Sequence, residues 1–167
     1  GLSILVQSQG QNLLYDGGDR EHSSFVVSYL QKQNISIIDY MISSHYDEDH
    51  VAGLVGCLDS FSVKNVIGAD YVQDTNIYFE NSVAAQGLTV QHPEPGTDFA
   101  FGGGKFTVLS PQSISSNDND NSVAIRLENG NNHFLFTGDA ESAGEEAICN
   151  LGLDLSCDVI VPGHHGS

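Results

Sequence analysis

The first 43 residues alternate between short apolar runs and glycine-bearing turns, a pattern typical of a domain that mixes strands and helices. Residues 3–7 and 12–15 have the composition of two strands, and Gln9-Gly10-Gln11 between them is typical of a tight turn. Apolar residues at helical spacing follow from Ser23, with a serine available as the N-cap. Residues 35–43 then form a mostly apolar run, as expected of a strand that is covered on both faces.

The rest of the chain continues this mixture of elements. Helices are predicted over residues 51–58, 74–86 and about 141–150, the second with Asp74 as its cap. Strands are predicted over residues 65–67, 88–91, 106–109, 123–128, 133–137 and 158–161. Residues 99–104 and Asn129-Gly130-Asn131 are typical of hairpin turns, and residues 112–121 form a loop rich in Ser, Asn and Asp. With no internal repeat, the pattern indicates one α/β domain over residues 1–167, with a mixed sheet or a pair of sheets.

Length and composition agree with a single soluble domain. A chain of 167 residues with 40% hydrophobic residues buries roughly 70% of the surface that its unfolded form exposes, which is enough for a core without disulfides. No run approaches the roughly 20 apolar residues of a membrane-spanning helix. The first residues also lack the basic segment and the cleavage site of a signal peptide. We therefore expect no membrane segment in this chain.

The charge is strongly negative and limits the possible partners. The sequence has 22 Asp and Glu against 5 Lys and Arg, a formal net charge of −17. The five basic residues are too few and too scattered to form the basic patch with which proteins bind nucleic acid. A phosphate-bearing substrate would therefore need bound cations, which invert the local field.

The three cysteines do not form a zinc motif. Cys57, Cys149 and Cys157 lack the C-x-x-C spacing of thiolate zinc sites. Cys149 and Cys157 flank a predicted helix-to-strand connection, so either a disulfide between them or three buried thiols is consistent with the sequence.

Metal-ligating side chains recur directly after predicted strands, where loops on a rigid sheet present functional groups. Four of them, His45, Asp47, Asp49 and His50, fall within six residues between a strand and a helix. Imidazole together with carboxylate is a good ligand set for a divalent metal, and surface solubility does not explain such a cluster. The other groups of this kind are Asp16, Asp139 and the pair His164-His165.

The cluster and its neighbours resemble motifs of the metallo-β-lactamase fold. His45-x-Asp47-x-Asp49-His50 is similar to the second family motif, commonly His-x-His-x-Asp-His. The sequences 13–18 (LLYDGG) and 136–139 (FTGD) resemble the first motif and the strand that delivers a metal-bridging aspartate. Within the family, the sequences 49–54, 119–127, 137–141 and 164–167 are similar to the hydrolase domain of ComEC-type DNA-internalisation competence proteins. The resemblance covers essentially the whole chain.

The resemblance implies an αββα sandwich with two metal ions at one edge of its two sheets. It assigns His45 and Asp47 to one ion, Asp49 and His50 to the other, and Asp139 to both. One of His164 and His165 would complete the second metal and the other would contact substrate or donate a proton, so Asp49, His164 and His165 are the expected catalytic residues. Asp16 would fix the loop beneath the ligands. The third motif is normally a histidine, and here Asp120 or Asn119 stands in its place as the expected ligand.

Two divalent ions would lower the pKa of a shared water and present hydroxide to an electrophile. Asp47 hardens the ligand set and favours Mn²⁺ or Mg²⁺ over Zn²⁺, although Zn²⁺ stays a candidate. We therefore expect a metal-dependent hydrolase of phosphodiesters, such as a nuclease on single-stranded DNA linked to DNA uptake. The alternatives are hydrolysis of an acyl substrate (a lactone, thioester or β-lactam) and a metal-binding module without turnover.

The resemblance also indicates that the sequence is a fragment of the family's domain. It begins in mid-hairpin and stops directly after His164-His165-Gly166-Ser167, whereas family members continue through further strands and a helix. We therefore expect the fold to be incomplete at both ends. Because the competence proteins of this type carry membrane channel segments and their hydrolase domain is thought to act outside the cytoplasm, the expected location is extracytoplasmic or membrane-associated.

Overall fold

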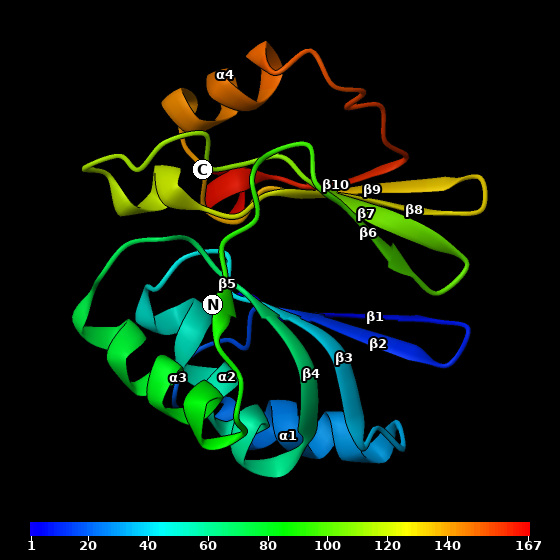
Figure 1. The fold of residues 1–167 in the computed structure, drawn as a ribbon, viewed down its shortest axis with the longest axis vertical. Coiled ribbons are helices and arrows are strands. Elements are labelled where there is room, and N and C mark those ends of the chain that lie inside the picture. The colour runs from blue at the N-terminus through cyan, green and yellow to red at the C-terminus, as the bar shows by residue number, and fades with distance from the viewer. The chain divides into compact units, whose positions relative to one another are not determined.

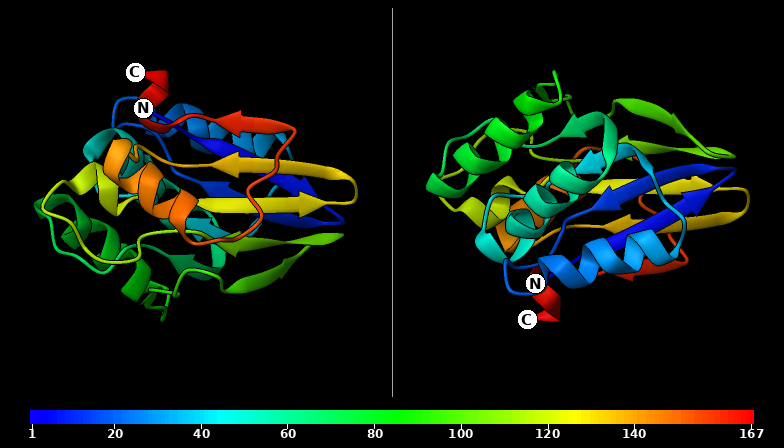
Figure 2. Two further views of the ribbon diagram at one scale, coloured as in Figure 1. Left: turned by 90° about the horizontal axis from the view of Figure 1, so that it is seen from above. Right: turned by 90° about the horizontal axis from the view of Figure 1, so that it is seen from below.

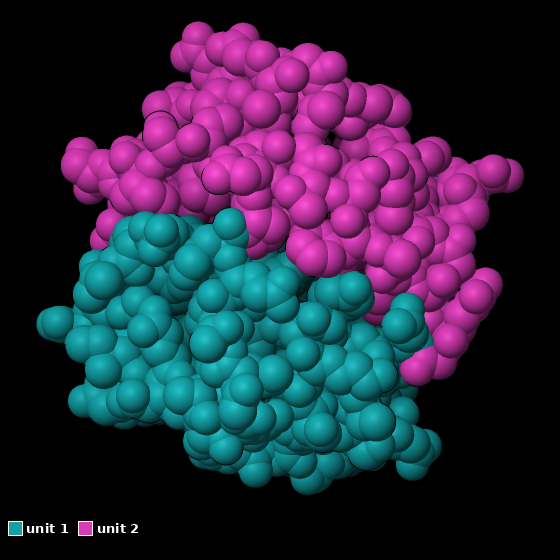
Figure 3. Space-filling view, in the orientation of Figure 1, with its two compact units in different colours: residues 1–7, 11–92 teal, residues 8–10, 93–167 magenta.

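The computed structural model describes all residues 1–167 as two compact units, each built on one five-stranded sheet (Figure 3). Unit 1 comprises residues 1–7 and 11–92, and unit 2 comprises residues 8–10 and 93–167. The two sheets confirm the predicted α/β class and decide between a single mixed sheet and a pair of sheets.

The sheet of unit 1 has the order β1-β2-β3-β4-β5, and its strands β2 to β5 are parallel (Figure 1). Parallel neighbours need crossover connections, which the helices of this unit supply. The elements are β1 (Ile4–Ser8), β2 (Gln11–Tyr15), α1 (Ser23–Lys32), β3 (Ile37–Ile42), α2 (Glu48–Ser60), β4 (Ser62–Ile67), α3 (Asp74–Ala85) and β5 (Val90–Gln91).

The three helices of unit 1 cover one face of its sheet, as the ribbon views show (Figures 1 and 2). The core between them joins strand residues such as Ile38 and Met41 to helix residues such as Leu54 and Phe79, all of them fully buried. Burial of such side chains contributes roughly 1.5–3 kcal/mol each. This packing fixes the end of β3 and the start of α2, where the polar cluster lies.

The sheet of unit 2 has the order β10-β9-β8-β7-β6, with antiparallel pairs from β6 to β9 and a parallel pair between β9 and β10. Helix α4 packs on one face through Ile148, which joins a cluster with Leu109, Ala124 and Leu135. The elements are β6 (Asp98–Phe101), β7 (Gly104–Val108), the 3-10 helix η1 (Asp118–Asn121), β8 (Ile125–Asn129), β9 (Asn132–Phe136), α4 (Ser142–Asn150), β10 (Val159–Val161) and the 3-10 helix η2 (Gly163–Gly166).

The predicted helices and strands are present, but the prediction missed strand β6 (Asp98–Phe101), where it placed only a hairpin turn, and the 3-10 helices η1 and η2. Three helix starts are also corrected. Helix α2 begins at Glu48 rather than at Val51, because Glu48 and Asp49 are favoured in the first turn by the helix dipole. Helix α1 has His22 at its N-cap position without a side-chain cap, so the predicted serine cap is wrong. Gln73, not Asp74, is the N-cap of α3, where it forms a capping box with Asn76.

The cysteines are all free thiols, so the disulfide alternative is wrong. Cys57 is buried and burial raises the pKa of its thiol to about 12, whereas Cys149 and Cys157 are exposed. The alternative of three buried thiols therefore holds only for Cys57. None of the helices combines the length and the apolar run that a membrane crossing requires.

Candidate metal centre

The polar cluster of unit 1 lies where β3 ends and α2 begins. Asp47 is the N-cap residue of α2, and its carbonyl oxygen accepts the backbone N–H groups of His50 and Val51 at 3.0 Å. Asp49 and His50 therefore belong to the first turn of the helix, whereas His45 and Asp47 precede it. The loop and the helical turn together bring these four side chains to one end of the sheet.

Tyr46, within the cluster, anchors the loop instead of facing solvent. Its side chain is fully buried and its hydroxyl donates to the carbonyl oxygen of Ala69 at 2.8 Å. The ring lies 4.9 Å from that of Tyr71, whose hydroxyl accepts the Tyr46 N–H. Burial raises the pKa of Tyr46, so this residue stays a neutral phenol that fixes the positions of its two neighbours.

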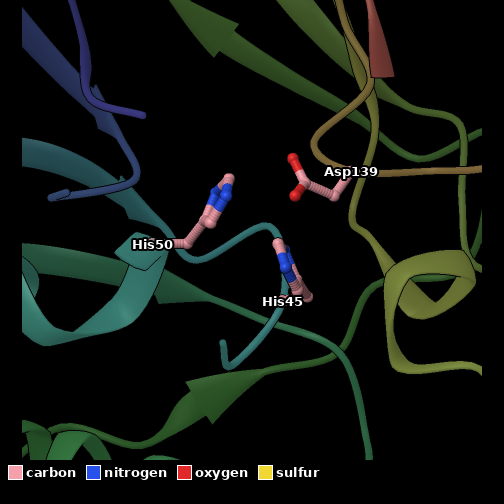
Figure 4. A group of neighbouring side chains, drawn as sticks. All are labelled: His45, His50 and Asp139. Atoms are coloured by element: carbon pink, nitrogen blue, oxygen red, sulfur yellow. The ribbon is translucent and has the colours of Figure 1, made fainter. Parts of the chain in front are cut away.

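His45 and His50 are fully buried, with ring centroids 4.3 Å apart and planes tilted by 52° (Figure 4). Nδ1 of His50 lies 2.8 Å from Asp16 Oδ2, and Nδ1 of His45 lies 2.9 Å from Ser44 Oγ. The Ser44 hydroxyl donates to Asp16 Oδ2 at 2.7 Å, so its oxygen accepts from His45. The network therefore assigns the Nδ1–H tautomer to both rings, which makes Nε2 the ligand nitrogen of each.

Asp16 is the carboxylate that sets both tautomers, and it is held by close backbone packing. It is fully buried and its Oδ1 accepts the backbone N–H of Ser44 at 2.7 Å. The following Gly17 donates its N–H to the carbonyl oxygen of His50 at 2.8 Å. A Cβ on Gly53 of α2 would stand 1.8 Å from the Gly17 oxygen, so only glycine allows this approach.

The two aspartates of the cluster approach the imidazoles at matching distances. Asp47 Oδ2 lies 3.6 Å from Nε2 of His45, and Asp49 Oδ2 lies 3.7 Å from Nε2 of His50. Gln73 Nε2 donates to the other oxygen of Asp47 at 3.1 Å and so orients that carboxylate. Both aspartates are partly exposed, with side-chain exposures of 39% and 44%, so ligands from solvent can reach them.

Unit 2 presents a third pair of this kind. Asp139, labelled in Figure 4, follows β9 after the left-handed Gly138 and is buried. Its backbone N–H donates to Ser122 Oγ at 3.0 Å. Asp139 Oδ2 lies 3.6 Å from Nε2 of His165 in η2. His165 therefore approaches Asp139 as the two imidazoles of unit 1 approach their aspartates.

The neighbouring His164 faces a different partner. Its Nδ1 lies 3.2 Å from Glu141 Oε1. His164 and His165 have φ angles of 46° and 56°, in the left-handed region that is unfavourable for residues with a side chain. Such backbone conformations persist where the surroundings determine them, and they are enriched at functional sites. The structure thus gives the two histidines separate carboxylate partners.

Asp120, the expected third-motif ligand, serves as a cap for α4. Its Oδ1 accepts the backbone N–H groups of Glu141 and Gly144 at 3.0 Å, and its Oδ2 accepts from Asn117 Nδ2 at 3.1 Å. The alternative ligand Asn119 donates its amide to Glu141 Oε1 at 2.9 Å. These contacts favour a structural role for both residues.

The donor set fits a divalent metal. Two ligands that each lie about 2.1 Å from a tetrahedral ion are about 3.4 Å apart. The pairs His45–Asp47, His50–Asp49 and His165–Asp139 have N···O distances of 3.6, 3.7 and 3.6 Å, longer than hydrogen bonds and close to this spacing. Buried imidazoles whose Nδ1 is bound to a carboxylate or hydroxyl are typical of metal sites.

This chain belongs to the metallo-β-lactamase superfamily, whose family model matches residues 1–165. Membership implies a metal-dependent hydrolase fold, with divalent ions as its cofactors. The β-lactamase SMB-1, solved with mercaptoacetic acid, has a TM-score of 0.67 at 13% identity, over 97% of this chain and 72% of that one. The predicted fold class is therefore confirmed.

Among curated proteins, the chain is similar in sequence to proteins of recombination and competence. Recombination protein 2 of Haemophilus influenzae is 30% identical over all of this chain and 20% of its own length. Competence protein ComA of Neisseria gonorrhoeae is 30% identical over all of this chain and 22% of its own length. The chain thus spans about a fifth of the relatives it matches, and the predicted resemblance to competence proteins is confirmed.

Sequence reasoning missed three polar residues that position the site. Ser44 links Asp16 to His45, Ser122 holds the backbone of Asp139, and Glu141 contacts His164. Each lies within two residues of a predicted ligand or in a quoted motif, but a single serine or glutamate at such a place gives no signal of its contacts.

Proposed function

We propose that this chain is a metal-dependent hydrolase of phosphodiesters. The observation that supports it best is the set of three imidazole–carboxylate pairs with N···O distances of 3.6–3.7 Å. The proposed ligands are His45, Asp47, Asp49 and His50 in unit 1, and Asp139 with His165 in unit 2. The bridging role of Asp139 that the sequence resemblance implies is part of this proposal. Asp120 is left out because its carboxylate caps α4.

The chain's own residues prepare the ligands for metal. Asp16 and Ser44 keep the Nδ1–H tautomer of both buried imidazoles, so neither ring must rotate or lose its Nδ1 proton when an ion binds. Bound divalent ions would supply Lewis-acid activation of the phosphoryl group and of water. The carboxylate-rich donor set suits Mn²⁺, and Zn²⁺ is the alternative with which it must be compared.

Charge and relatives support a phosphodiester of DNA as the substrate. With a formal charge of −17 the protein repels a polyanion, so the ions themselves must attract the phosphate. Recombination acts on DNA, so a relative that is named for it favours DNA as the source of that phosphate. We include single-stranded DNA in the proposal. An extracytoplasmic or membrane-associated place, as part of a longer competence protein, belongs to this proposal.

The test is hydrolysis of bis-p-nitrophenyl phosphate and of single-stranded DNA by the purified chain with Mn²⁺ or Zn²⁺. We expect metal-dependent cleavage that Asp49→Ala abolishes and that Asp59→Ala, a matched change at the other end of α2, leaves intact. Equal activity in Asp49→Ala would overturn the proposal. Tight metal binding without hydrolysis, or turnover of nitrocefin alone, would instead assign a binding module or an acyl hydrolase.

A further inference from the structure

Glu141 is hydrogen-bonded by residues 117–120, the loop in which the sequence resemblance places the third family motif. Asn117 Nδ2 donates to Glu141 Oε2 at 3.0 Å, and Asn119 Nδ2 donates to Glu141 Oε1 at 2.9 Å. We name this pair, Asn117 and Asn119, the asparagine clamp. The same loop accepts the backbone N–H of Glu141 through Asp120 Oδ1. Both the side chain and the backbone of Glu141 are therefore fixed.

The fixed carboxylate is placed against His164. Glu141 Oε1 lies 3.2 Å from His164 Nδ1. The Glu141 oxygens accept the amide donors of Asn119 and Asn117, and a carboxylate that only accepts leaves the ring nitrogen of His164 as the donor of this contact. A neutral His164 then carries its proton on Nδ1, and its Nε2 is a hydrogen-bond acceptor.

The contact between Glu141 and His164 lies next to the proposed metal ligands of unit 2 and is accessible to solvent. Glu141 follows Asp139 by two residues and His164 precedes His165 by one, so the contact joins the two segments that carry the proposed ligands of unit 2. Glu141 and His164 both line a cavity of about 300 Å³, and their side chains are 43% and 44% exposed. The side chain of His164 is therefore accessible to a molecule from solvent.

We propose that Glu141 is a positioning residue that fixes His164 in one orientation and one tautomer, so that Nε2 accepts a hydrogen bond from the substrate. The asparagine clamp keeps Glu141 in place. This inference rests on the proposed function and deepens it, because it names the substrate group that His164 recognises. The group must be a hydrogen-bond donor next to the phosphodiester, a sugar hydroxyl or a nucleobase amino group, since Glu141 and Glu145 in the same cavity disfavour a second phosphate.

The first test reads the tautomer and needs no activity. In ¹⁵N-histidine-labelled protein, two-bond ¹H–¹⁵N spectra distinguish protonated Nδ1 from protonated Nε2, and His164→Ala assigns the signal. We expect Nδ1–H in the wild type and in Glu145→Ala, the matched control from the same cavity. We expect loss of this preference in Glu141→Ala and a partial loss in Asn119→Ala, which leaves Glu141 itself intact. An unchanged His164 signal in both variants would overturn the inference.

The second test uses two substrates that differ in donor groups. Bis-p-nitrophenyl phosphate has no hydrogen-bond donor, whereas a deoxydinucleotide has several. With Mn²⁺, Glu141→Ala should lower kcat/KM for the dinucleotide by about 10-fold and for the nitrophenyl diester by less than about 3-fold, since one hydrogen bond is at stake. Equal losses on both substrates would overturn the role of His164 in recognition.

Metal content separates positioning from ligation. Glu141→Ala should keep the metal content of the wild type, whereas His165→Ala should lose metal. Loss of metal in Glu141→Ala as well would make His164 a ligand and overturn the inference. If the wild type hydrolyses neither diester, the proposed function fails, but the tautomer spectra still decide whether Glu141 fixes His164.

Discussion

The two units present the same pairing of imidazole and carboxylate in contrasting surroundings. In unit 1 the rings of His45 and His50 are fully buried, and one buried carboxylate, Asp16, sets both of them through direct and Ser44-mediated contacts. In unit 2 the side chains of His164 and His165 are 44% and 42% exposed and lie in a strained 3-10 turn. Burial thus prepares one set of donors, and a polar network of loops prepares the other.

The contrast indicates which substitutions should affect folding and metal binding in each unit. Donors embedded in a packed core depend on close backbone contacts, because a core tolerates little change of volume. Donors on loops depend on hydrogen bonds that are each worth about 1 kcal/mol. Changes beneath the imidazoles of unit 1 should therefore affect folding and metal together, whereas changes in the loops of unit 2 should affect them separately.

The largest effect is expected from Gly53→Ala, which disrupts the close contact between α2 and the backbone of Gly17 in unit 1. Its Cβ would stand 1.8 Å from the carbonyl oxygen of Gly17 and would push the loop that carries Asp16 away from α2. We expect a loss of about 3 kcal/mol or more of unfolding free energy in urea. In Gly56→Ala on the same helix, the new Cβ comes too close only to the flexible Ser23 hydroxyl, at 2.2 Å, and its other neighbours lie at ordinary contact distance. This variant should stay within about 1 kcal/mol of the wild type. Similar stabilities of the two variants would contradict the backbone contact.

Asp16→Ala should be the next largest change, because it removes the acceptor for His50 Nδ1 and for the Ser44 N–H and hydroxyl. We expect a cost of about 2–4 kcal/mol and a loss of metal affinity of about 10–100-fold, measured by titration calorimetry with Mn²⁺ and Zn²⁺. Asp39→Ala removes another buried carboxylate of the same unit and should lower stability alone. Unchanged metal affinity in Asp16→Ala would show that the tautomers do not depend on this residue.

Asp120→Ala, in unit 2, should have a smaller effect. It should lower stability and leave metal binding unchanged. It removes the acceptor for two N–H groups at the start of α4, a loss worth about 0.5–2 kcal/mol in thermal unfolding. Metal affinity should stay at the wild-type value. A drop of 10-fold or more would restore Asp120 as a ligand, as its place in the third motif predicts.

The smallest effect is expected for the ion pair between Asp39 in β3 and Lys64 in β4, and it depends on pH. Burial raises the pKa of Asp39, but the Lys64 ammonium and the Asn12 N–H outweigh it and hold that pKa below its usual range. A carboxyl with a lowered pKa contributes stability above its unfolded pKa of 3.8 and loses it as the pH falls. Lys64→Met should therefore cost up to about 1 kcal/mol at pH 7 and nothing near pH 2, in urea unfolding at both pH values. The exposed pair Lys105–Asp98 of unit 2 is the control, and Lys105→Met should cost less.

The sequence predicted more about the strands and the ligands than about what surrounds them. Apolar runs such as residues 35–43 and the turn at Gly130 reveal their elements through local pattern, and the motif around His45 is dense enough to stand out. The role of Asp120 was not predictable, because a carboxylate in a polar loop fits either a metal or a helix terminus that is distant in sequence. Likewise the left-handed turn at His164 has no local signal, since only a small fraction of residues other than glycine adopt this conformation and nothing in the sequence marks which of them do.

Helix α2 starts at Glu48, directly after Asp47. The number of residues between Asp47 and His50 therefore sets the direction in which the His50 side chain leaves the helix axis. Each residue of an α-helix advances by about 100° around the axis. His50 is the third residue of this helix, and its ring enters the core toward Asp16 only at that phase. Deleting or inserting one residue between Asp47 and His50 would turn the imidazole by about a quarter of a revolution, away from Asp16 and the other proposed ligands.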